Sequence, residues 1–199
     1  MKTLLYLILT ILTVNLSASA TPKERKEFKE GCTNNSPRAC YNLAMMYEYG
    51  DGVEVNDAQA LKYYLKVCDF GHATSCAKAA NLYENSPTIE QNFKEANKLY
   101  TKACGGGSGI GCHNVAITYA KSENPLMQKY SLNFYNKACH AGYAPSCIFL
   151  GRVYRDSKSL THDYEKAKEV FDIACELNDR LGCKELRILE ELEKSGYAK

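Results

Sequence analysis

Ten cysteines occur in five pairs with one internal spacing, and this spacing constrains the fold more than any other feature of the chain. Each pair has the form Cys-x7-Cys, and the first cysteines of successive pairs are 36, 36, 35 and 36 residues apart. The pairs are Cys32/Cys40, Cys68/Cys76, Cys104/Cys112, Cys139/Cys147 and Cys175/Cys183. A constant period of this length is typical of an array in which one supersecondary unit recurs. We therefore interpret the cysteines as structural parts of a solenoid.

The first twenty residues have the pattern of an export signal. Lys2 precedes an apolar run from Leu4 to Leu16, and Ala18-Ser19-Ala20 forms an A-x-A cleavage pattern. We predict cleavage after Ala20, with an uncleaved anchor as the alternative, and no stable membrane insertion of the mature chain. An exported chain with an even number of cysteines is expected to form disulfides in an oxidising compartment. The predicted location is therefore secreted or periplasmic.

The charge balance of the chain is close to neutral. The formal net charge is +2, and removal of Lys2 with the signal would lower it by one. Such a balance gives no electrostatic reason to expect binding to nucleic acid or to a membrane surface.

The segments that begin at the second cysteine of each pair share a helical pattern, which we name helix A. The first four copies are CYNLAMMYEYG, CAKAANLYENS, CHNVAITYAKS and CIFLGRVYRDS. With the cysteine as position zero, position three is apolar, position four is small and position seven is tyrosine. These positions lie on one face of an α-helix, and the small residue allows a neighbouring helix to approach closely.

The segments that end at the first cysteine of each later pair form a second helical pattern, helix B. An aromatic residue stands four positions before the cysteine and a small residue stands eight before it. The third residue after the first cysteine of each pair is glycine or asparagine, which tolerate the left-handed conformation that closes a helix. These residues are Asn35, Gly71, Gly107, Gly142 and Asn178. Helix B therefore ends, the chain turns, and helix A of the next unit runs antiparallel to it. This geometry brings nearest-neighbour cysteines within bridging reach and predicts five disulfides in sequence order.

Metal ligation is the alternative use of so many cysteines. Zinc sites require cysteines two to four residues apart, and the four histidines hold no fixed place in the repeat. We therefore expect no metal and no cofactor.

The predicted fold class is all-α, an α/α superhelical solenoid of helix-turn-helix repeats in which a disulfide cross-links each hairpin. Phe28 takes the aromatic place of helix B, whereas Arg187 and Glu190 give the last helix a charged outer face. We predict a signal peptide over 1–20 and a single domain over 21–199, with a capping helix at 22–32, repeats at about 38–68, 74–104, 110–139 and 145–175, and a C-terminal capping helix at 181–195.

The repeat resembles a known family. The helix A pattern, the turn Tyr47-Glu48-Tyr49-Gly50-Asp51-Gly52-Val53 and the ending Tyr63-Tyr64-x-x-x-Cys68 resemble Sel1-like repeats, which are related to tetratricopeptide repeats. The regular Cys-x7-Cys spacing narrows the resemblance to the secreted cysteine-rich Sel1-like proteins, known as the Helicobacter cysteine-rich protein family. Repeats two to four depart from the turn, with Ser86-Pro87, Asn124-Pro125 and Ser157-Lys158 in its place. Because of this departure, the resemblance does not predict the conformation of the loops from helix A to helix B in these repeats.

The resemblance implies two alternative functions. Members of that family are described as penicillin-binding proteins and β-lactamases, which implies a β-lactam or peptidoglycan-like small molecule as ligand. Sel1-like and tetratricopeptide arrays in general are adaptors, which implies a peptide or protein ligand in a concave groove. We favour the scaffold and keep a weakly active β-lactam hydrolase as the alternative.

Three short segments resemble the serine β-lactamase motifs S-x-x-K, S-D-N and K-T-G. They are Ser75-Cys76-Ala77-Lys78, Ser122-Glu123-Asn124 and Lys194-Ser195-Gly196. The segments belong to separate repeats, and short motifs of this kind are expected by chance. We therefore assign no catalytic residues, and the enzymatic question stays open.

The candidate groove residues occupy positions one, five and eight of helix A, which lie off the packing face. They are Tyr41, Met45, Glu48, Asn81, Glu84, His113, Ile117, Ile148, Arg152 and Arg155. Stacked repeats would align them into a stripe with acidic residues at one end and arginines at the other. The alternative is that Met45, Ile117 and Ile148 are buried against the next repeat.

Overall fold

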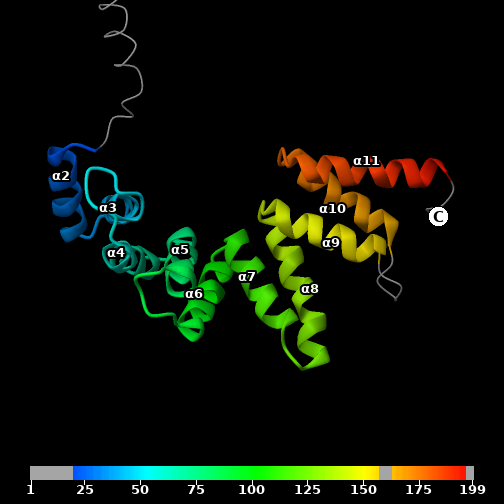
Figure 1. The fold of residues 1–199 in the computed structure, drawn as a ribbon, viewed down its shortest axis with the longest axis horizontal. Helices are drawn as coiled ribbons and strands as arrows, with labels where there is room; N and C mark the ends of the chain where they lie inside the picture. The colour runs from blue at the N-terminus through cyan, green and yellow to red at the C-terminus, as the bar shows by residue number, and fades with distance from the viewer. Residues whose placement is uncertain (1–19, 157–162, 196–199) are drawn as a thin grey trace, which may run out of the picture. The chain divides into compact units, whose positions relative to one another are not determined.

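The computed structural model describes residues 20–156 and 163–195. These residues form ten α-helices and no strand. The helices are α2 (Pro22–Thr33), α3 (Pro37–Tyr49), α4 (Asp57–Asp69), α5 (Ala73–Asn85), α6 (Phe93–Gly105), α7 (Gly109–Ala120), α8 (Pro125–His140), α9 (Ala144–Asp156), α10 (Tyr164–Glu176) and α11 (Arg180–Lys194) (Figure 1). The even-numbered helices are copies of helix B and the odd-numbered ones are copies of helix A. The predicted all-α fold of disulfide-linked helical hairpins is confirmed.

Polar side chains begin most of the helices. Ser36, Ser108, Asn124 and Asp179 each accept a hydrogen bond from a backbone N–H of the first turn that has no partner within the helix. Thr21 does the same for α2 and forms a reciprocal capping box with Glu24. These caps fix the residue at which each of these five helices begins.

The turns between helix B and helix A adopt the conformation that the sequence predicts. Asn35 and Asn178 have φ of 61°, and the glycines at the corresponding positions of the central pairs have φ between 82° and 86°. A residue with a branched side chain would be strained in this left-handed region. This conformation explains why the repeat has glycine or asparagine at this position.

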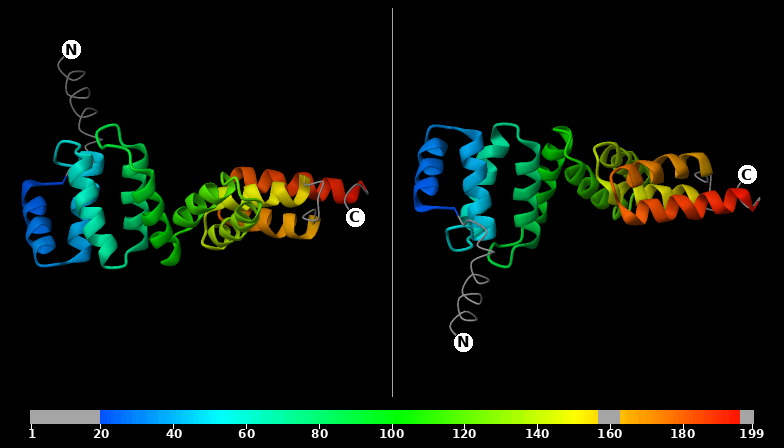
Figure 2. Two further views of the ribbon diagram at one scale, coloured as in Figure 1. Left: turned by 90° about the horizontal axis from the view of Figure 1, so that it is seen from below. Right: turned by 90° about the horizontal axis from the view of Figure 1, so that it is seen from above.

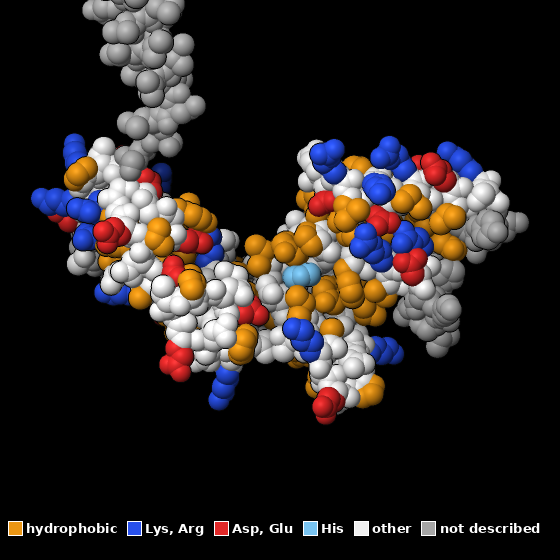
Figure 3. Space-filling view, viewed as in Figure 1, with side chains coloured by type: hydrophobic (Ala, Val, Ile, Leu, Met, Phe, Trp, Pro, Cys, Tyr) orange, Lys and Arg blue, Asp and Glu red, His pale blue; other side chains and the backbone are white. Residues whose placement is uncertain are grey.

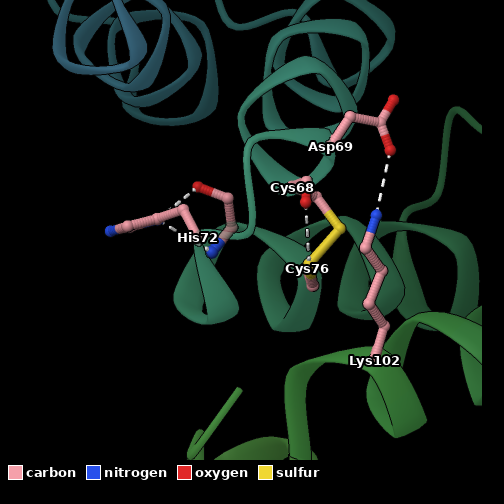
Figure 4. Close-up of a disulfide and its surroundings, with 6 residues drawn as sticks. Cys68, Asp69, His72, Cys76 and Lys102 are labelled. Atoms are coloured by element: carbon pink, nitrogen blue, oxygen red, sulfur yellow. Dashed lines mark hydrogen bonds and ion pairs between the residues drawn. A yellow bond between two sulfur atoms is a disulfide. The ribbon is translucent and has the colours of Figure 1, made fainter. Parts of the chain in front are cut away.

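Each hairpin carries one disulfide, and the five bridges join the cysteines in sequence order with Cα–Cα distances of 4.4–4.7 Å. They are Cys32–Cys40, Cys68–Cys76, Cys104–Cys112, Cys139–Cys147 and Cys175–Cys183. Figure 4 shows the bridge from Cys68 at the end of α4 to Cys76 in α5. Next to it, Lys102 of α6 reaches Asp69 with an Nζ–Oδ1 distance of 3.0 Å. All ten cysteines are therefore committed to disulfides.

The chain divides into two compact units at Tyr63, within α4. The N-terminal unit contains α2, α3 and the first half of α4. The rings of Tyr47 and Tyr63 stack there with centroids 5.9 Å apart and an interplanar angle of 11°. In α3, Leu43 and Ala44 are fully buried, as expected for positions three and four of helix A.

The C-terminal unit runs from Tyr64 through α11. Successive helices pack against one another, and α5 also contacts α7, α9 contacts α11 and α8 contacts α10 (Figure 2). One core cluster includes Tyr135, Leu150 and Val170, and a second joins Phe171 to Leu189. Position four is glycine in α9 because a Cβ on Gly151 would clash with the ring of Phe171. The small residue of helix A thus admits the aromatic residue of helix B.

Several sequence predictions fall outside the described residues. These are the export signal, of which only Ala20 is described, the Ser157-Lys158 loop and Gly196 of the last serine-enzyme motif. Among the described helices, none combines the length and the apolar character needed to cross a membrane.

Candidate functional site

The groove residues predicted on α3 belong to the N-terminal unit. Tyr41, Met45 and Glu48 are each partly exposed on one side of this helix. The remaining candidates belong to the C-terminal unit.

Glu84 of α5 is joined to helix B of its own repeat. The Tyr100 hydroxyl donates a hydrogen bond to Glu84 Oε2 over 2.9 Å. Burial and this contact with a carboxylate raise the pKa of Tyr100 above its ordinary value, although a hydrogen bond from Asn81 acts to lower it. Tyr100 therefore stays protonated and orients Glu84.

A cleft of about 490 Å³ opens where α5, α6 and α7 meet, and we call it the α5–α7 cleft. Ligand sites for small molecules and short peptide segments are typically of this size, roughly 300–1,000 Å³. Its lining mixes lysine, carboxamide, hydroxyl and apolar side chains. The lining residues are Glu84, Phe93, Lys94, Ala96, Asn97, Tyr100, Asn114, Ile117, Thr118 and Lys121.

A row of aromatic rings lies where α7, α8 and α9 meet, and we call it the aromatic band. It consists of His113, Tyr135, Tyr143 and Phe149, whose neighbouring ring centroids are 4.2–5.5 Å apart. Phe149 is 40% exposed, whereas Tyr135 beneath it is buried. Figure 3 shows hydrophobic side chains gathered around a histidine on this face.

The cleft and the band adjoin. Ile117 and His113 are one helical turn apart on α7, and they belong to the cleft and the band respectively. Tyr143 of the band is also close enough to Tyr100 of the cleft to influence its pKa. The cleft and the band are therefore neighbours along α7, and together they bring aromatic, amide and charged groups to this part of the C-terminal unit.

The helix that joins the cleft to the band is fixed by a disulfide. Cys112, in the first turn of α7, is buried and bridged to Cys104 at the end of α6. The next residue along α7 is His113 of the band, and Ile117 of the cleft follows one turn later. Cys112 therefore has a structural role at this surface, because it holds α7 against α6 without being accessible to a ligand.

His113 is held in the band by a serine of the next helix A. Its Nδ1 lies 2.8 Å from Ser146 Oγ, and Ser146 has no exposed surface. Burial lowers the pKa of His113 below its ordinary value of 6.5, because the charged imidazolium loses more hydration than the neutral ring. His113 is therefore a neutral, fixed part of the surface.

Ile148 takes a different place from the other apolar candidates. It is 7% exposed and belongs to the core cluster with Leu150, whereas Ile117 packs against that cluster and also lines the cleft. Ile148 thus contributes to packing, and Ile117 is accessible to a ligand.

Arg152 and Arg155 form ion pairs with the buried Glu185 of the last helix, although the Arg152 side chain itself is half-exposed. Arg152 Nε donates to Glu185 Oε1 over 2.9 Å, and Arg155 Nη1 donates to Glu185 Oε2 over 2.5 Å. Glu185 is 6% exposed. Although burial acts to raise it, hydrogen bonds from the two arginines hold the pKa of the Glu185 carboxyl below its usual value. These guanidinium groups are engaged within the chain.

The segment that resembles S-x-x-K is buried. The Ser75 side chain has no exposed surface, and its Oγ lies 2.8 Å from His72 Nδ1. Lys78 Nζ lies 5.4 Å from the centroid of the Tyr64 ring. A nucleophile must reach its substrate, and the Ser75 hydroxyl is covered by the protein. The other two segments lie between α7 and α8 and at the end of α11.

Side chains that could bind a metal ion do not cluster in the part of the chain that the structure describes. No group of three or more histidine, cysteine, aspartate or glutamate side chains there has the geometry to hold a metal ion.

Most residues of this surface lie outside positions one, five and eight of helix A, so the sequence patterns did not predict them, and four of these residues bring polar groups to the cleft. They are Lys94, Asn97, Tyr100 and Lys121. The sequence feature that could have indicated a polar site here is Tyr100, four residues before Cys104, because the hydroxyl of a buried tyrosine requires a polar partner.

Comparison with known proteins identifies the repeat. A family model for the Sel1 repeat matches residues 37–72, 73–108 and 144–179. These segments do not include the predicted repeat at 110–139, which carries Cys112 and Cys139. The structure nevertheless gives that repeat the same pair of helices, α7 and α8, with a disulfide at each end. No curated protein matches the chain by sequence.

Solved structures with similar folds share 20% identity with the chain. They include a protective antigen of uropathogenic Escherichia coli (TM-score 0.68, covering 81% of this chain and 35% of that one) and a Sel1 repeat protein from Oxalobacter formigenes (0.69, 81% and 65%). An immunity protein from Pseudomonas aeruginosa also matches (0.53, 79% and 59%). The chain therefore spans between about a third and two thirds of these proteins, and the likeness is one of fold.

Proposed function

Because the chain belongs to the Sel1 repeat family, we propose that it is a disulfide-stabilised scaffold that binds an extended peptide segment of a partner protein. The binding surface is the α5–α7 cleft together with the aromatic band. The observation that carries the proposal is their continuity through Ile117 and His113, because an extended peptide needs several adjoining subsites.

The chemistry of this surface suits a peptide. Rings such as Phe149 provide apolar contact area, and Tyr135 packs beneath Phe149 with ring centroids 4.2 Å apart, so little side-chain entropy is lost on binding. The carboxamide and hydroxyl groups of the cleft can donate to and accept from a peptide backbone. Three disulfides, Cys68–Cys76, Cys104–Cys112 and Cys139–Cys147, hold the helices that carry these groups.

Selection from a displayed library of random dodecapeptides tests this proposal. We expect recovered peptides to bind the disulfide-bonded protein, and Phe149→Ser and Ile117→Ser each to weaken binding at least about tenfold, or ~1.4 kcal/mol. Leu126→Ser is the matched control, because Leu126 is 56% exposed on α8 and lines neither the cleft nor the band. Peptides that bind all three variants equally would place the binding site elsewhere. Recovery of no specific peptide would contradict the function.

We also propose that the chain is exported and that it resembles the secreted cysteine-rich Sel1-like proteins in this respect. The five disulfides support an oxidising compartment. Cleavage after Ala20 would preserve the cap of α2, because the Thr21 nitrogen donates to Glu24 Oε2 over 2.7 Å and would do so more strongly as an ammonium. N-terminal sequencing of the protein from cell fractions tests this, with Thr21 as the expected first residue. An intact Met1 in the cytoplasmic fraction would contradict it.

A further inference from the structure

We propose that the α5–α7 cleft recognises a carboxylate of the bound peptide, next to an apolar residue of the same peptide. The carboxylate comes from an acidic side chain or from a free C-terminus. This inference rests on the proposed peptide-binding function and adds the chemistry of the ligand.

Two lysines in the cleft provide the positive charge. Lys94 is in the first turn of α6, and Lys121 is the C-cap residue of α7. Among the residues that the structure describes, neither has an ion-pair partner. The other lysines of α6 differ in this respect, since Lys98 pairs with Glu95 at 3.1 Å and Lys102 pairs with Asp69 at 3.0 Å.

The lining of the cleft has a net positive charge. Its one carboxylate is Glu84, which accepts the hydrogen bond from Tyr100. Two ammonium groups and one carboxylate leave an excess of one positive charge, which favours an anionic group over a cationic one. Arginine, which suits the geometry of phosphate, is absent from this lining.

A carboxamide of the cleft lacks a partner. Asn97 Oδ1 is buried, and no hydrogen-bond donor among the described residues reaches it. An unsatisfied buried acceptor is unfavourable, because it has lost its hydrogen bond to water without gaining another. A small rotation of the Asn97 side chain would present this oxygen to a backbone N–H of a bound peptide, since that torsion is soft.

Apolar side chains complete the cleft. Phe93 is 62% exposed at the start of α6, and Ile117 lines the wall that α7 provides. An apolar side chain of the peptide would cover Phe93 while the neighbouring carboxylate contacts the lysines. The size and the chemistry of the cleft thus match a segment of two or three residues.

Three pools of N-acetylated hexapeptides with randomised apolar positions provide the probe. The first pool contains one Asp or Glu and an amidated C-terminus. The second replaces the acid by Asn or Gln, and the third is the second pool with a free C-terminal carboxylate. Each pool is titrated into the ¹⁵N-labelled, disulfide-bonded protein, and backbone amide shifts locate the bound peptides.

We expect the first pool, the third pool or both to shift the amides around Lys94, Asn97 and Ile117. Saturation should require at least tenfold less peptide than with the second pool. The double variant Lys94→Gln/Lys121→Gln should remove this difference. Lys184→Gln, which changes an exposed lysine of α11 outside the cleft, should leave it unchanged. The relative effects of the first and third pools distinguish a side-chain carboxylate from a C-terminal one.

The outcomes separate this inference from the function on which it rests. If the second pool binds the cleft as tightly as the others, or if every pool shifts only the aromatic band, peptide binding stands and carboxylate recognition is overturned. If no pool shifts any amide, both proposals are overturned together.

Discussion

Two contacts between successive copies of helix A use the same spacing and different chemistry. In the contact between α7 and α9, the neutral His113 meets Ser146, which is 33 residues further along the chain. In the contact between α9 and α11, Arg152 meets Glu185, again 33 residues further along. We call them the aromatic joint and the charged joint. The repeat backbone therefore fixes which positions meet, and the side chains alone decide how the joint responds to mutation and pH.

Loss of Glu185 should have the largest effect, because it removes a buried carboxylate that contacts both arginines of the charged joint. The Arg155 side chain, which is 16% exposed, would keep Asp156 and the ring of Phe171 as neighbours but would lose the buried carboxylate of Glu185. We expect Glu185→Ala to lower the free energy of unfolding by about 3 kcal/mol, measured by urea denaturation. Glu191→Ala, at an exposed position of the same helix, should change it by less than about 0.5 kcal/mol. Equal losses in the two variants would show that the charged joint adds no stability.

The disulfides beside the two joints should stabilise the folded protein equally, whereas the two joints should stabilise it by different amounts. The bridges Cys139–Cys147 and Cys175–Cys183 both have a sequence separation of 8. Closing a loop of this length stabilises a protein by ~2.5 kcal/mol in the loop-entropy description. Replacement of either pair by serines should therefore cost this amount in denaturation measurements without reductant. A difference above about 1 kcal/mol between the two pairs would refute the loop-entropy explanation.

The aromatic joint should tolerate loss of its polar contact better than the charged joint. His113→Phe keeps a ring against Tyr135 and Tyr143 but leaves the buried Ser146 hydroxyl without its partner. We expect a loss of about 1–2 kcal/mol in the free energy of unfolding. The double variant His113→Phe/Ser146→Ala should recover most of it, because both polar groups are then removed. Additive losses in the double variant would exclude coupling between the two side chains.

The smallest expected effect is a difference in pH dependence. The folded pKa of His113 is lowered, so below its ordinary value of 6.5 the unfolded chain binds this proton more readily than the folded one. The contribution of His113 is complete above that pH and falls as the solution becomes more acidic. Glu185 also has a lowered pKa, but its contribution declines only below its ordinary value of 4.5. Between pH 7 and pH 5 the aromatic joint should therefore weaken while the charged joint does not.

Thermal unfolding at successive pH values tests this difference. The melting temperature of the wild-type protein should fall from pH 7 to pH 5 more than that of His113→Phe, whereas Glu185→Ala should retain the wild-type slope. If the melting temperatures of the wild type and of His113→Phe fall equally between pH 7 and pH 5, His113 is not the source of the pH dependence.

The sequence predicts the fold well because each hairpin is specified locally. The left-handed turns at Asn35 and Asn178, the small residue at Gly151 and the bridge from Cys68 to Cys76 all follow from residue types at fixed spacing. Local geometry and steric exclusion determine each of them. No knowledge of distant contacts is required.

The surface is less predictable because it depends on contacts between repeats. Positions one, five and eight of helix A place Ile117 in the cleft, yet they also include Ile148, which the neighbouring helices bury. Glu185 is a second example, since nothing in its own helix indicates that two arginines 30 and 33 residues earlier will enclose it. The sequence patterns do not identify Lys94 and Asn97 for a related reason, because they give helix B only a role in packing against helix A.

The short disulfide loops determine how the chain can oxidise as it folds. Each cysteine meets its native partner across 8 residues, whereas Cys112 and Cys139, the nearest cysteines of different hairpins, are 27 residues apart. By loop-closure entropy alone, the shorter loop is favoured by about 1 kcal/mol, before the turn adds any preference of its own. A chain that enters an oxidising compartment from its N-terminus therefore exposes each matched pair before the next pair arrives. Mispaired intermediates should be few, and the protein should depend little on a disulfide isomerase.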